Sequence, residues 1–442
     1  MRSLVFIAAT CPLLLATLAQ PFLGILLWSW ISFMNPHREV WGFAMNLPWA
    51  MMVLGATLVG CIVAREPKRF PANAVTLLFL LLAVLFTITT MTGLGTETGA
   101  WDKWDRTMKV IIGLLLTASL LTTRHRLHAM IWLMVLALGY YGVRGGLFTL
   151  ATGGGYRVHG PELTMIADNN HVGAAMLVVL PLMNWLRVYA KHRIVRIGLA
   201  IAMGCTLFGI LGTQSRGALV GLAAVACVFW LRSRHKMIGG AIMAAALVAG
   251  ISFMPQKWAD RMNTIGAYQA DESAMTRLEL WGISLKLALD RPLVGAGFRG
   301  PYTRSAVDRV EPGGPARAVH SIWFETLGEH GFPTFFAWVG LTVAGLWYTF
   351  RLTRLAKGRP ELAWAGDLGR MIQVSIVAYC TAGTFLSLAY WDFYWTLLIV
   401  APAALAIAQR STAAVTLPAG RSWGARLASP APAWARTARA NP

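Results

Sequence analysis

Apolar runs of about twenty residues, separated by short polar segments, fill most of the 442-residue chain. A helix of that length crosses the roughly 30 Å hydrocarbon core of a bilayer, where only helices and closed barrels satisfy every backbone group. The pattern therefore predicts an all-α polytopic membrane protein with about twelve transmembrane helices. About nine crossings precede residue 254, and the first is kinked near residues 20–21.

One polar interval, residues 255–333, is far longer than any other break in this pattern. The chain thus divides into a transmembrane bundle (1–254), this large late loop, C-terminal transmembrane helices (334–409) and a basic tail (410–442) of a composition typical of disorder. Because a membrane enzyme needs a folded surface outside the lipid, we expect any chemistry to take place in the 255–333 loop.

A segment inside this loop has the apolar spacing of a surface helix. Apolar residues recur every three or four positions along residues 273–290, while Lys286 and Asp290 lie on other faces. Such a helix is expected to lie along the membrane surface. The apolar residues are Met275, Leu278, Trp281, Leu285 and Leu289.

Composition and charge agree with a membrane protein. Hydrophobic residues make up 56% of the chain and charged residues 13%, against about a quarter in soluble chains. A net charge of +20 would suggest nucleic acid in a soluble protein, but here short Lys/Arg loops set topology by the positive-inside rule. We expect membrane lipids and no nucleic acid as partners. The rule puts the basic loops and the N-terminus beside Arg2 in the cytoplasm, and the 255–333 loop on the other side.

Two arginines are candidates for binding an anion. Arg216 lies in the short turn 213–218 between two apolar runs, where an arginine is costly unless it is paired or faces a wet cavity. Arg277 opens the amphipathic segment, so its guanidinium would lie at headgroup depth and could hold a phosphate through two hydrogen bonds. The alternatives are an interfacial anchor for Arg216 and a surface charge beside Glu279 for Arg277.

His320 is the candidate general base. It follows a Pro- and Gly-rich patch at residues 312–315 and begins a segment with helical spacing. Near a helix N-terminus the dipole disfavours imidazolium, which would leave a neutral ring able to accept a proton. A structural role is the alternative.

Other chemistries have no motif in the chain. There is no acidic pair for a metal that bridges a diphosphate, and no P-loop, HExxH or GxSxG motif. The five cysteines fall in apolar runs without a CxxC pair, so neither a zinc site nor a disulfide framework is expected. A diphosphate would therefore be neutralised by Arg and Lys, without a metal or another cofactor.

Seven further residues are weaker candidates. Asn170 and His171 follow a glycine-rich loop and could cap the next helix or bind sugar hydroxyls. Asp392 lies at a membrane edge and could orient a histidine or an arginine, while Lys103 and Arg106 could meet anionic headgroups. The full set is Lys103, Arg106, Arg144, Asn170, His171, Arg299 and Asp392.

Short segments of the second half of the chain also occur in a distinctive order. They are Ser-Arg-Gly-Ala at 215–218, Arg-Leu-x-x-Trp at 277–281, Arg-Pro-Leu-Val-Gly-Ala-Gly-Phe at 291–298, His320-Ser321 and Glu329-His330-Gly331. This order resembles the O-antigen ligase (WaaL) family, within a broader set of O-antigen polymerases and bacterial O-oligosaccharyltransferases. That family is similar to the GT-C membrane glycosyltransferases, and the resemblance covers residues 160–400.

The resemblance implies transfer of O-antigen polysaccharide from undecaprenyl diphosphate to a sugar hydroxyl of the lipid A core. It implies a Gram-negative inner-membrane enzyme whose site faces the periplasm and which inverts the anomeric carbon without metal or nucleotide. His320 would deprotonate the acceptor hydroxyl. Arg216 and Arg277 would hold the diphosphate and stabilise the charge on the leaving group.

One departure from the family leaves the acceptor open. The commoner pattern has His-Asn where this chain has His320-Ser321. The Trp-rich N-terminal third is similar to O-glycosylation ligases found beside exosortase systems, so the acceptor is either the lipid A core or protein Ser/Thr. The remaining alternatives are an O-antigen polymerase and, in a different class, a flippase for lipid-linked glycans that needs no base.

Overall fold

The computed structural model describes residues 2–94, 99–232, 245, 248, 250, 252–256, 258 and 272–416. The regular secondary structure of these residues is helical, without a β-strand. The α-helices are α1 (Arg2–Ala19), α2 (Pro21–Met34), α3 (Trp49–Val63), α4 (Ala74–Met91), α5 (Ala100–Leu120), α6 (Arg124–Ala151), α7 (Asn169–Tyr189), α8 (Arg193–Gly212), α9 (Arg216–Arg232), α12 (Glu272–Asp290), α13 (Arg304–Val310), α14 (Ile322–Ala356), α15 (Ala363–Gly383) and α16 (Asp392–Thr416). The 3-10 helices are η1 (Pro36–Arg38), η2 (Phe43–Met45), η5 (Gly300–Tyr302) and η6 (Pro360–Leu362).

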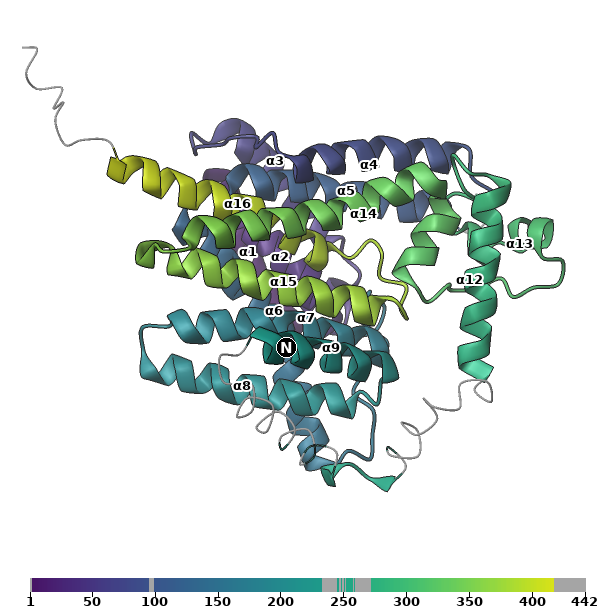
Figure 1. Cartoon of the computed structure of the whole chain (residues 1–442). Helices are drawn as coiled ribbons and strands as arrows, with labels where there is room; N and C mark the ends of the chain where they lie inside the picture. Colours follow the sequence, from purple (N-terminus) through teal and green to yellow (C-terminus); the bar gives the residue numbers. More distant parts are fainter. Residues whose placement is uncertain are drawn as a thin grey trace, which may run out of the picture.

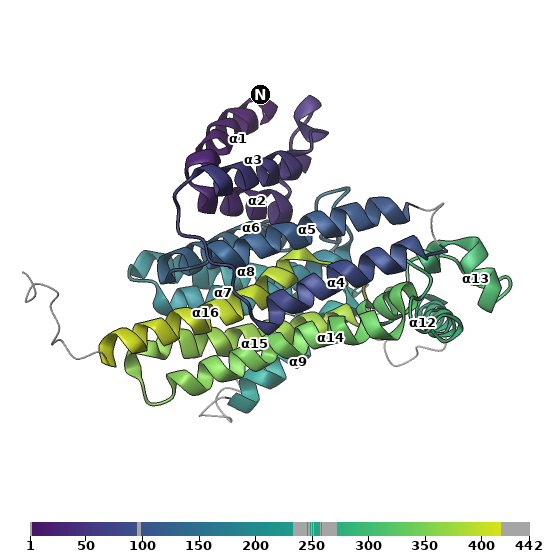
Figure 2. The same cartoon turned by 90° about the horizontal axis from the view of Figure 1, so that it is seen from above.

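Most of the long helices run along one common direction (Figures 1 and 2). Among the described residues, seven helices are long and apolar enough to cross a membrane: α1, α4, α6, α7, α8, α14 and α16. Three shorter apolar helices, α2, α3 and α9, accompany them. The expected all-α polytopic membrane protein is confirmed. The count of twelve stays a prediction, because residues 233–244 and most of those from there to 271 lie outside the described residues.

α7 lies within the core of the bundle. Between Val172 and Leu186 every residue except Asn184 is buried, as expected for a helix that is apolar on all sides and surrounded by protein. It packs on α6, α8, α9 and α15, and Ser375 of α15 donates a hydrogen bond to the Val178 carbonyl at 2.7 Å. This pair of helices fixes the position of the bundle end where α7 begins and α15 ends.

The N-terminal region differs from the single kinked span expected there. The helix stops at Gln20, because Pro21 has no amide hydrogen with which to continue it. The next helix, α2, folds back along α1, and both pack on α3. Ser3 donates a hydrogen bond to the carbonyl of Trp41, which follows α2. The two helices therefore form a hairpin, with the N-terminus at the same end as the residues that follow α2.

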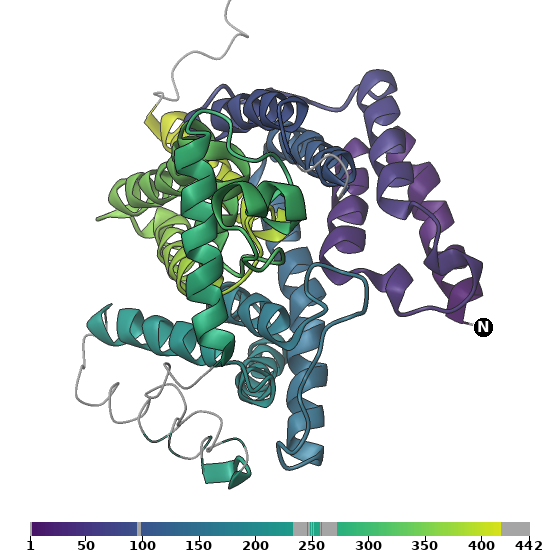
Figure 3. The ribbon, with the colours of Figure 1, turned by 90° about the vertical axis from the view of Figure 1, so that its right-hand side faces the viewer.

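α12 crosses one end of the bundle, where the ends of the long helices face it (Figures 1 and 3). Its inner side packs on α14 and α13 and buries Leu280, Ile283 and Leu287. Four of the apolar residues that the sequence pattern groups together remain exposed on its outer side, where a membrane surface could receive them. They are Met275, Leu278, Leu285 and Leu289.

Candidate functional site

His320 lies just before α14, at the end of the bundle that α12 crosses. Its backbone is left-handed (φ 53°), a conformation that residues other than glycine adopt infrequently, and its amide donates a hydrogen bond to Ser387 Oγ at 3.0 Å. The side chain is half-buried. The nearby His330 is fully buried, with Thr89 Oγ1 2.6 Å from its Nδ1. Of these two histidines, only His320 is open to a substrate.

Charged groups around His320 shift its pKa in opposite directions. Burial lowers the pKa, and the neighbouring Arg277 and His171 lower it further. Asp168 and Glu325 raise it by smaller amounts. The net pKa lies below the ordinary value of 6.5, so the imidazole is neutral at pH 7, which is the state that a general base needs.

Asn170 and His171 belong to the start of α7, where Asp168 caps the helix. Asp168 Oδ1 accepts hydrogen bonds from the backbone amide and the side chain of Asn170, both at 2.8 Å, and lies 3.4 Å from His171 Nδ1. The His171 ring and the Asn170 donors hold the pKa of Asp168 well below its usual range. The cap thus adds an ionised carboxylate to the surroundings of His320.

Arg216 is the first residue of α9 and follows a turn that is held on two sides. Gln214 has a left-handed backbone (φ 52°), and its Nε2 donates a hydrogen bond to the Gly154 carbonyl at 3.1 Å. Asn169 of α7 donates from Nδ2 to the Thr213 carbonyl at 2.7 Å. These bonds attach the turn to the start of α7 and place the half-buried Arg216 at the same end as His320.

Arg277 lies one helical turn before Trp281 on α12. The Trp281 ring stacks on Phe324 with centroids 5.3 Å apart, and its Nε1 donates a hydrogen bond to the Val319 carbonyl at 3.1 Å. These contacts attach α12 to the segment around His320. They bring Arg277 close enough to lower the pKa of that ring.

The loop after α15 connects these parts. Ser387 of this loop accepts the hydrogen bond from the His320 backbone amide. In the same loop, the centroid of the Phe385 ring lies 6.2 Å from that of the Trp281 ring on α12. Phe385 also lies against Gly217 of α9, where an added Cβ would be 3.5 Å from the Phe385 Cβ. A histidine and two arginines from three separate segments therefore share one end of the bundle.

A buried ionic cluster joins α5 and α14 next to this site. Lys103 Nζ lies 3.0 Å from Glu325 Oε1 and 2.8 Å from Glu329 Oε1. Glu329 also accepts hydrogen bonds from the Tyr390 hydroxyl at 2.7 Å and from the Arg299 amide at 2.8 Å. Oε2 of Glu325 has no hydrogen-bond partner among the described residues. The positive charge of Lys103 thus compensates the negative charges of Glu325 and Glu329. Of these two, Glu325 also raises the pKa of His320.

Glu325, Glu329 and Tyr390 were not among the site residues predicted from the sequence. The available signal was the presence of two glutamates four residues apart in an otherwise apolar segment, since buried glutamates are nearly always paired. Their partner Lys103 is more than 200 positions away in the chain. No local spacing pattern could connect them.

Three other weaker candidates lie outside this group. Arg144 pairs with Glu39 at 2.9 Å. Asp392 accepts hydrogen bonds from the Ser32 hydroxyl and from a backbone amide, and no hydrogen bond links it to a histidine or an arginine of the described segments. Together with Arg106 it lines a separate cavity of about 700 Å³.

Two family models match the chain. A family of unknown function (DUF5935) matches residues 1–191, and the O-antigen ligase family matches residues 201–339. No curated protein matches it. Arg216, Arg277 and His320 all lie within the second match, whereas Lys103 lies in the first. Residues 201–339 of this membrane protein are therefore similar to the O-antigen ligase family, and this similarity supports an enzyme of the O-antigen ligase and polymerase type.

Proposed function

We propose that this protein transfers a glycan from undecaprenyl diphosphate to a sugar hydroxyl of the lipid A core, on the periplasmic face of the inner membrane and without a metal ion. The O-antigen ligase match supports the reaction class. The proposal depends above all on the gathering of Arg216, Arg277 and a half-buried His320 at one end of the bundle. A neutral base beside fixed positive charges suits a hydroxyl nucleophile and a diphosphate leaving group.

In the proposed reaction the acceptor oxygen attacks the anomeric carbon of the donor glycan. The bond between that carbon and the diphosphate oxygen breaks, and His320 takes the proton of the acceptor hydroxyl. Arg216 and Arg277 stabilise the negative charge that develops on the released undecaprenyl diphosphate. Because the acceptor attacks from the side opposite the leaving group, the anomeric configuration is inverted.

Replacing His320 with alanine should reduce glycan transfer by roughly 10²-fold or more, because the acceptor hydroxyl loses its base. The assay reconstitutes the full chain with undecaprenyl-diphosphate-linked glycan and purified core lipid in the presence of a chelator. His159→Ala is the matched control, since His159 is exposed in the loop before α7. Unchanged transfer by H320A, or a wild-type enzyme that stops when chelator is added, would contradict the mechanism.

The labelled product separates the alternatives. A ligase labels the core lipid, a polymerase lengthens a lipid-linked glycan, and an O-oligosaccharyltransferase labels protein Ser or Thr. A flippase would move the donor across the bilayer and keep most of its activity in H320A.

A further inference from the structure

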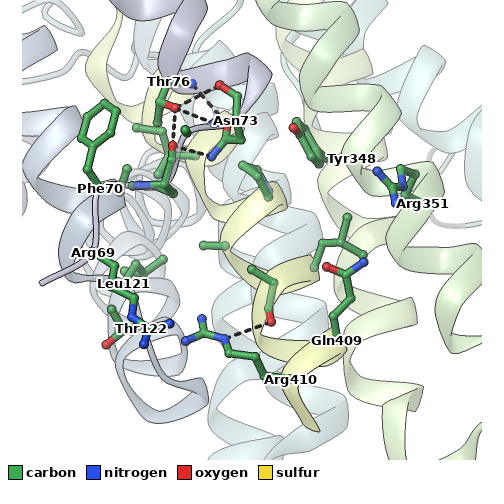
Figure 4. A pocket seen from close by; sticks show the side chains of 18 residues that line it. Arg69, Phe70, Asn73, Thr76, Leu121, Thr122, Tyr348, Arg351, Gln409 and Arg410 are labelled. Atoms are coloured by element: carbon green, nitrogen blue, oxygen red, sulfur yellow. Dashed lines mark hydrogen bonds between the residues drawn. The ribbon is translucent and has the colours of Figure 1, made fainter. Parts of the chain in front are cut away.

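A second cavity, of about 650 Å³, opens between α4, α5, α14 and α16 (Figure 4). Tyr348 and Arg351, near the end of α14, form one wall, and Gln409 and Arg410, near the end of α16, form another. Both helices start at the end where His320 lies and run along the bundle (Figure 1). The cavity is therefore at the opposite end of the molecule from the candidate site.

Among the described residues, three guanidinium groups and no carboxylate line this cavity. They belong to Arg69, Arg351 and Arg410. Arg410 donates a hydrogen bond from Nε to the Ala406 carbonyl of its own helix at 3.2 Å, and its guanidinium points towards the side of the cavity formed by Arg69 and Thr122 (Figure 4). None of the three makes a salt bridge with a carboxylate in the described parts of the chain. This concentration of positive charge favours an anionic occupant.

A neighbouring hollow extends the positive charge along the mouth of the cavity. It has a volume of about 460 Å³ and shares Arg351, Leu405 and Gln409 with the 650 Å³ cavity. Its other lining residues include Arg354, Lys357 and Arg359, and no carboxylate from the described parts of the chain lines it. Basic pockets between transmembrane helices are typical places for the headgroups of anionic lipids.

The rest of the cavity is apolar. Leu121 and Leu405 contribute to its wall, and Phe70 at its edge is 52% exposed. The wall is also well fixed, because Asn73 caps α4 and Ala74 donates a backbone hydrogen bond to the Tyr348 hydroxyl at 3.2 Å. A cavity lined by both apolar side chains and arginines suits a ligand with a charged head and a hydrocarbon chain better than a free anion.

We propose that this cavity binds an anionic membrane phospholipid. Arg69 and Arg410 hold the phosphate, and an acyl chain lies along the apolar wall towards the exposed leucines of α4. The phosphate of such a lipid offers several acceptor oxygens, which planar guanidinium groups bind in pairs. The site is separate from the proposed donor site, so it does not depend on the proposed glycan transfer.

The test is native mass spectrometry of the purified full chain, titrated with phosphatidylglycerol or with phosphatidylcholine of the same chain length. Wild-type protein should retain phosphatidylglycerol preferentially. The double variant Arg69→Gln/Arg410→Gln should bind it at least about tenfold more weakly, since each arginine near a lipid phosphate contributes about 1 kcal/mol. Arg193→Gln is the matched control, because Arg193 is exposed where α8 begins and does not line the cavity.

A second variant keeps the arginines and fills the space. Ala406 is exposed and lines the cavity, so Ala406→Trp should reduce phosphatidylglycerol retention without changing the buried core. Equal retention of the two lipids by wild type would overturn the proposal. So would undiminished binding by the double variant or by A406W. Full competition by millimolar inorganic phosphate would assign the site to a free anion and overturn the lipid assignment.

Discussion

The protonation state of His320 is set by residues from three other segments. Burial and Arg277 lower its pKa, whereas Asp168 raises it. The lowered pKa means that the base is already deprotonated at pH 7. Activity should therefore decline only as the pH falls below about 6.5 and the ring becomes protonated.

Two substitutions should shift the acidic limb of the pH–activity profile, where activity falls as His320 is protonated, in opposite directions. Arg277→Gln removes a positive charge, so the pKa of His320 should rise and the limb should shift to higher pH. Asp168→Asn removes a negative charge and should shift it to lower pH, while asparagine still caps α7. The measurement is kcat/KM against pH. Arg317→Gln is the control, since Arg317 is exposed and does not act on His320; shifts of the same sign in both variants would contradict this account.

The buried cluster around Lys103 should matter for stability. Lys103→Met leaves Glu325 and Glu329 without their cation and should destabilise the protein by roughly 3–5 kcal/mol, as observed when one partner of a buried ion pair is removed. Thermal unfolding of the detergent-purified protein measures this. Lys109→Met on the same helix is the control, because Lys109 pairs with Asp105 near the surface and should contribute about 1 kcal/mol or less. Equal effects of the two substitutions would contradict the structural role of Lys103.

At the scale of elements, α14 contains a bend on which the site depends. Gly331 has φ 71° and ψ −175°, a combination essentially limited to glycine. The bend separates residues 322–330, which carry the two glutamates of the cluster, from the long apolar part of the helix. The Phe332 amide then bonds to the Pro292 carbonyl at 2.9 Å, which ties the bend to the segment after α12.

Gly331→Ala should destabilise the protein by about 1–3 kcal/mol. An added Cβ would lie 2.6 Å from the Pro292 carbonyl oxygen, in addition to the backbone strain. Gly340→Ala, two to three turns later in the same helix, is a control of opposite sign. Its Cβ would meet nothing closer than 3.9 Å, so alanine should be neutral or stabilising by about 0.5–1 kcal/mol. Thermal unfolding distinguishes the two variants, and similar destabilisation by both would argue against a special role for the bend.

At the scale of the whole molecule, the α1–α2 hairpin determines on which side the chain begins. Ser3 lies beside Trp41, which follows α2. The N-terminus should therefore share a membrane side with the loop after α2. The positive-inside rule applied to Arg2 led to the opposite assignment, because it considered one charge and assumed one crossing.

Cysteine labelling tests this orientation. In a background with the native cysteines replaced, Ser3→Cys and Phe43→Cys should react with an impermeant reagent from the same side of the membrane. Arg359→Cys, in the connection between α14 and α15, should react only from the other side. Reaction of Ser3→Cys together with Arg359→Cys would contradict the hairpin.

The sequence by itself determined the helical, membrane-spanning class of this protein and most helix positions, because hydropathy and helix propensity are local properties. The interruption predicted near residues 20–21, for example, falls between the end of α1 at Ala19 and the start of α2 at Pro21. The sequence also marked Arg216, Arg277 and His320 as candidates, because the chemistry they offer depends on residue type. Their roles in catalysis remain predictions.

Only the tertiary structure decided how distant parts meet. It paired Lys103 with Glu329, folded α1 back on α2, and placed Arg69 in the same cavity as Arg410. Each of these results depends on contacts between residues separated by tens to hundreds of positions. Periodicity specifies which face of a helix is apolar, but the partner of that face is chosen by packing and charge compensation across the whole bundle.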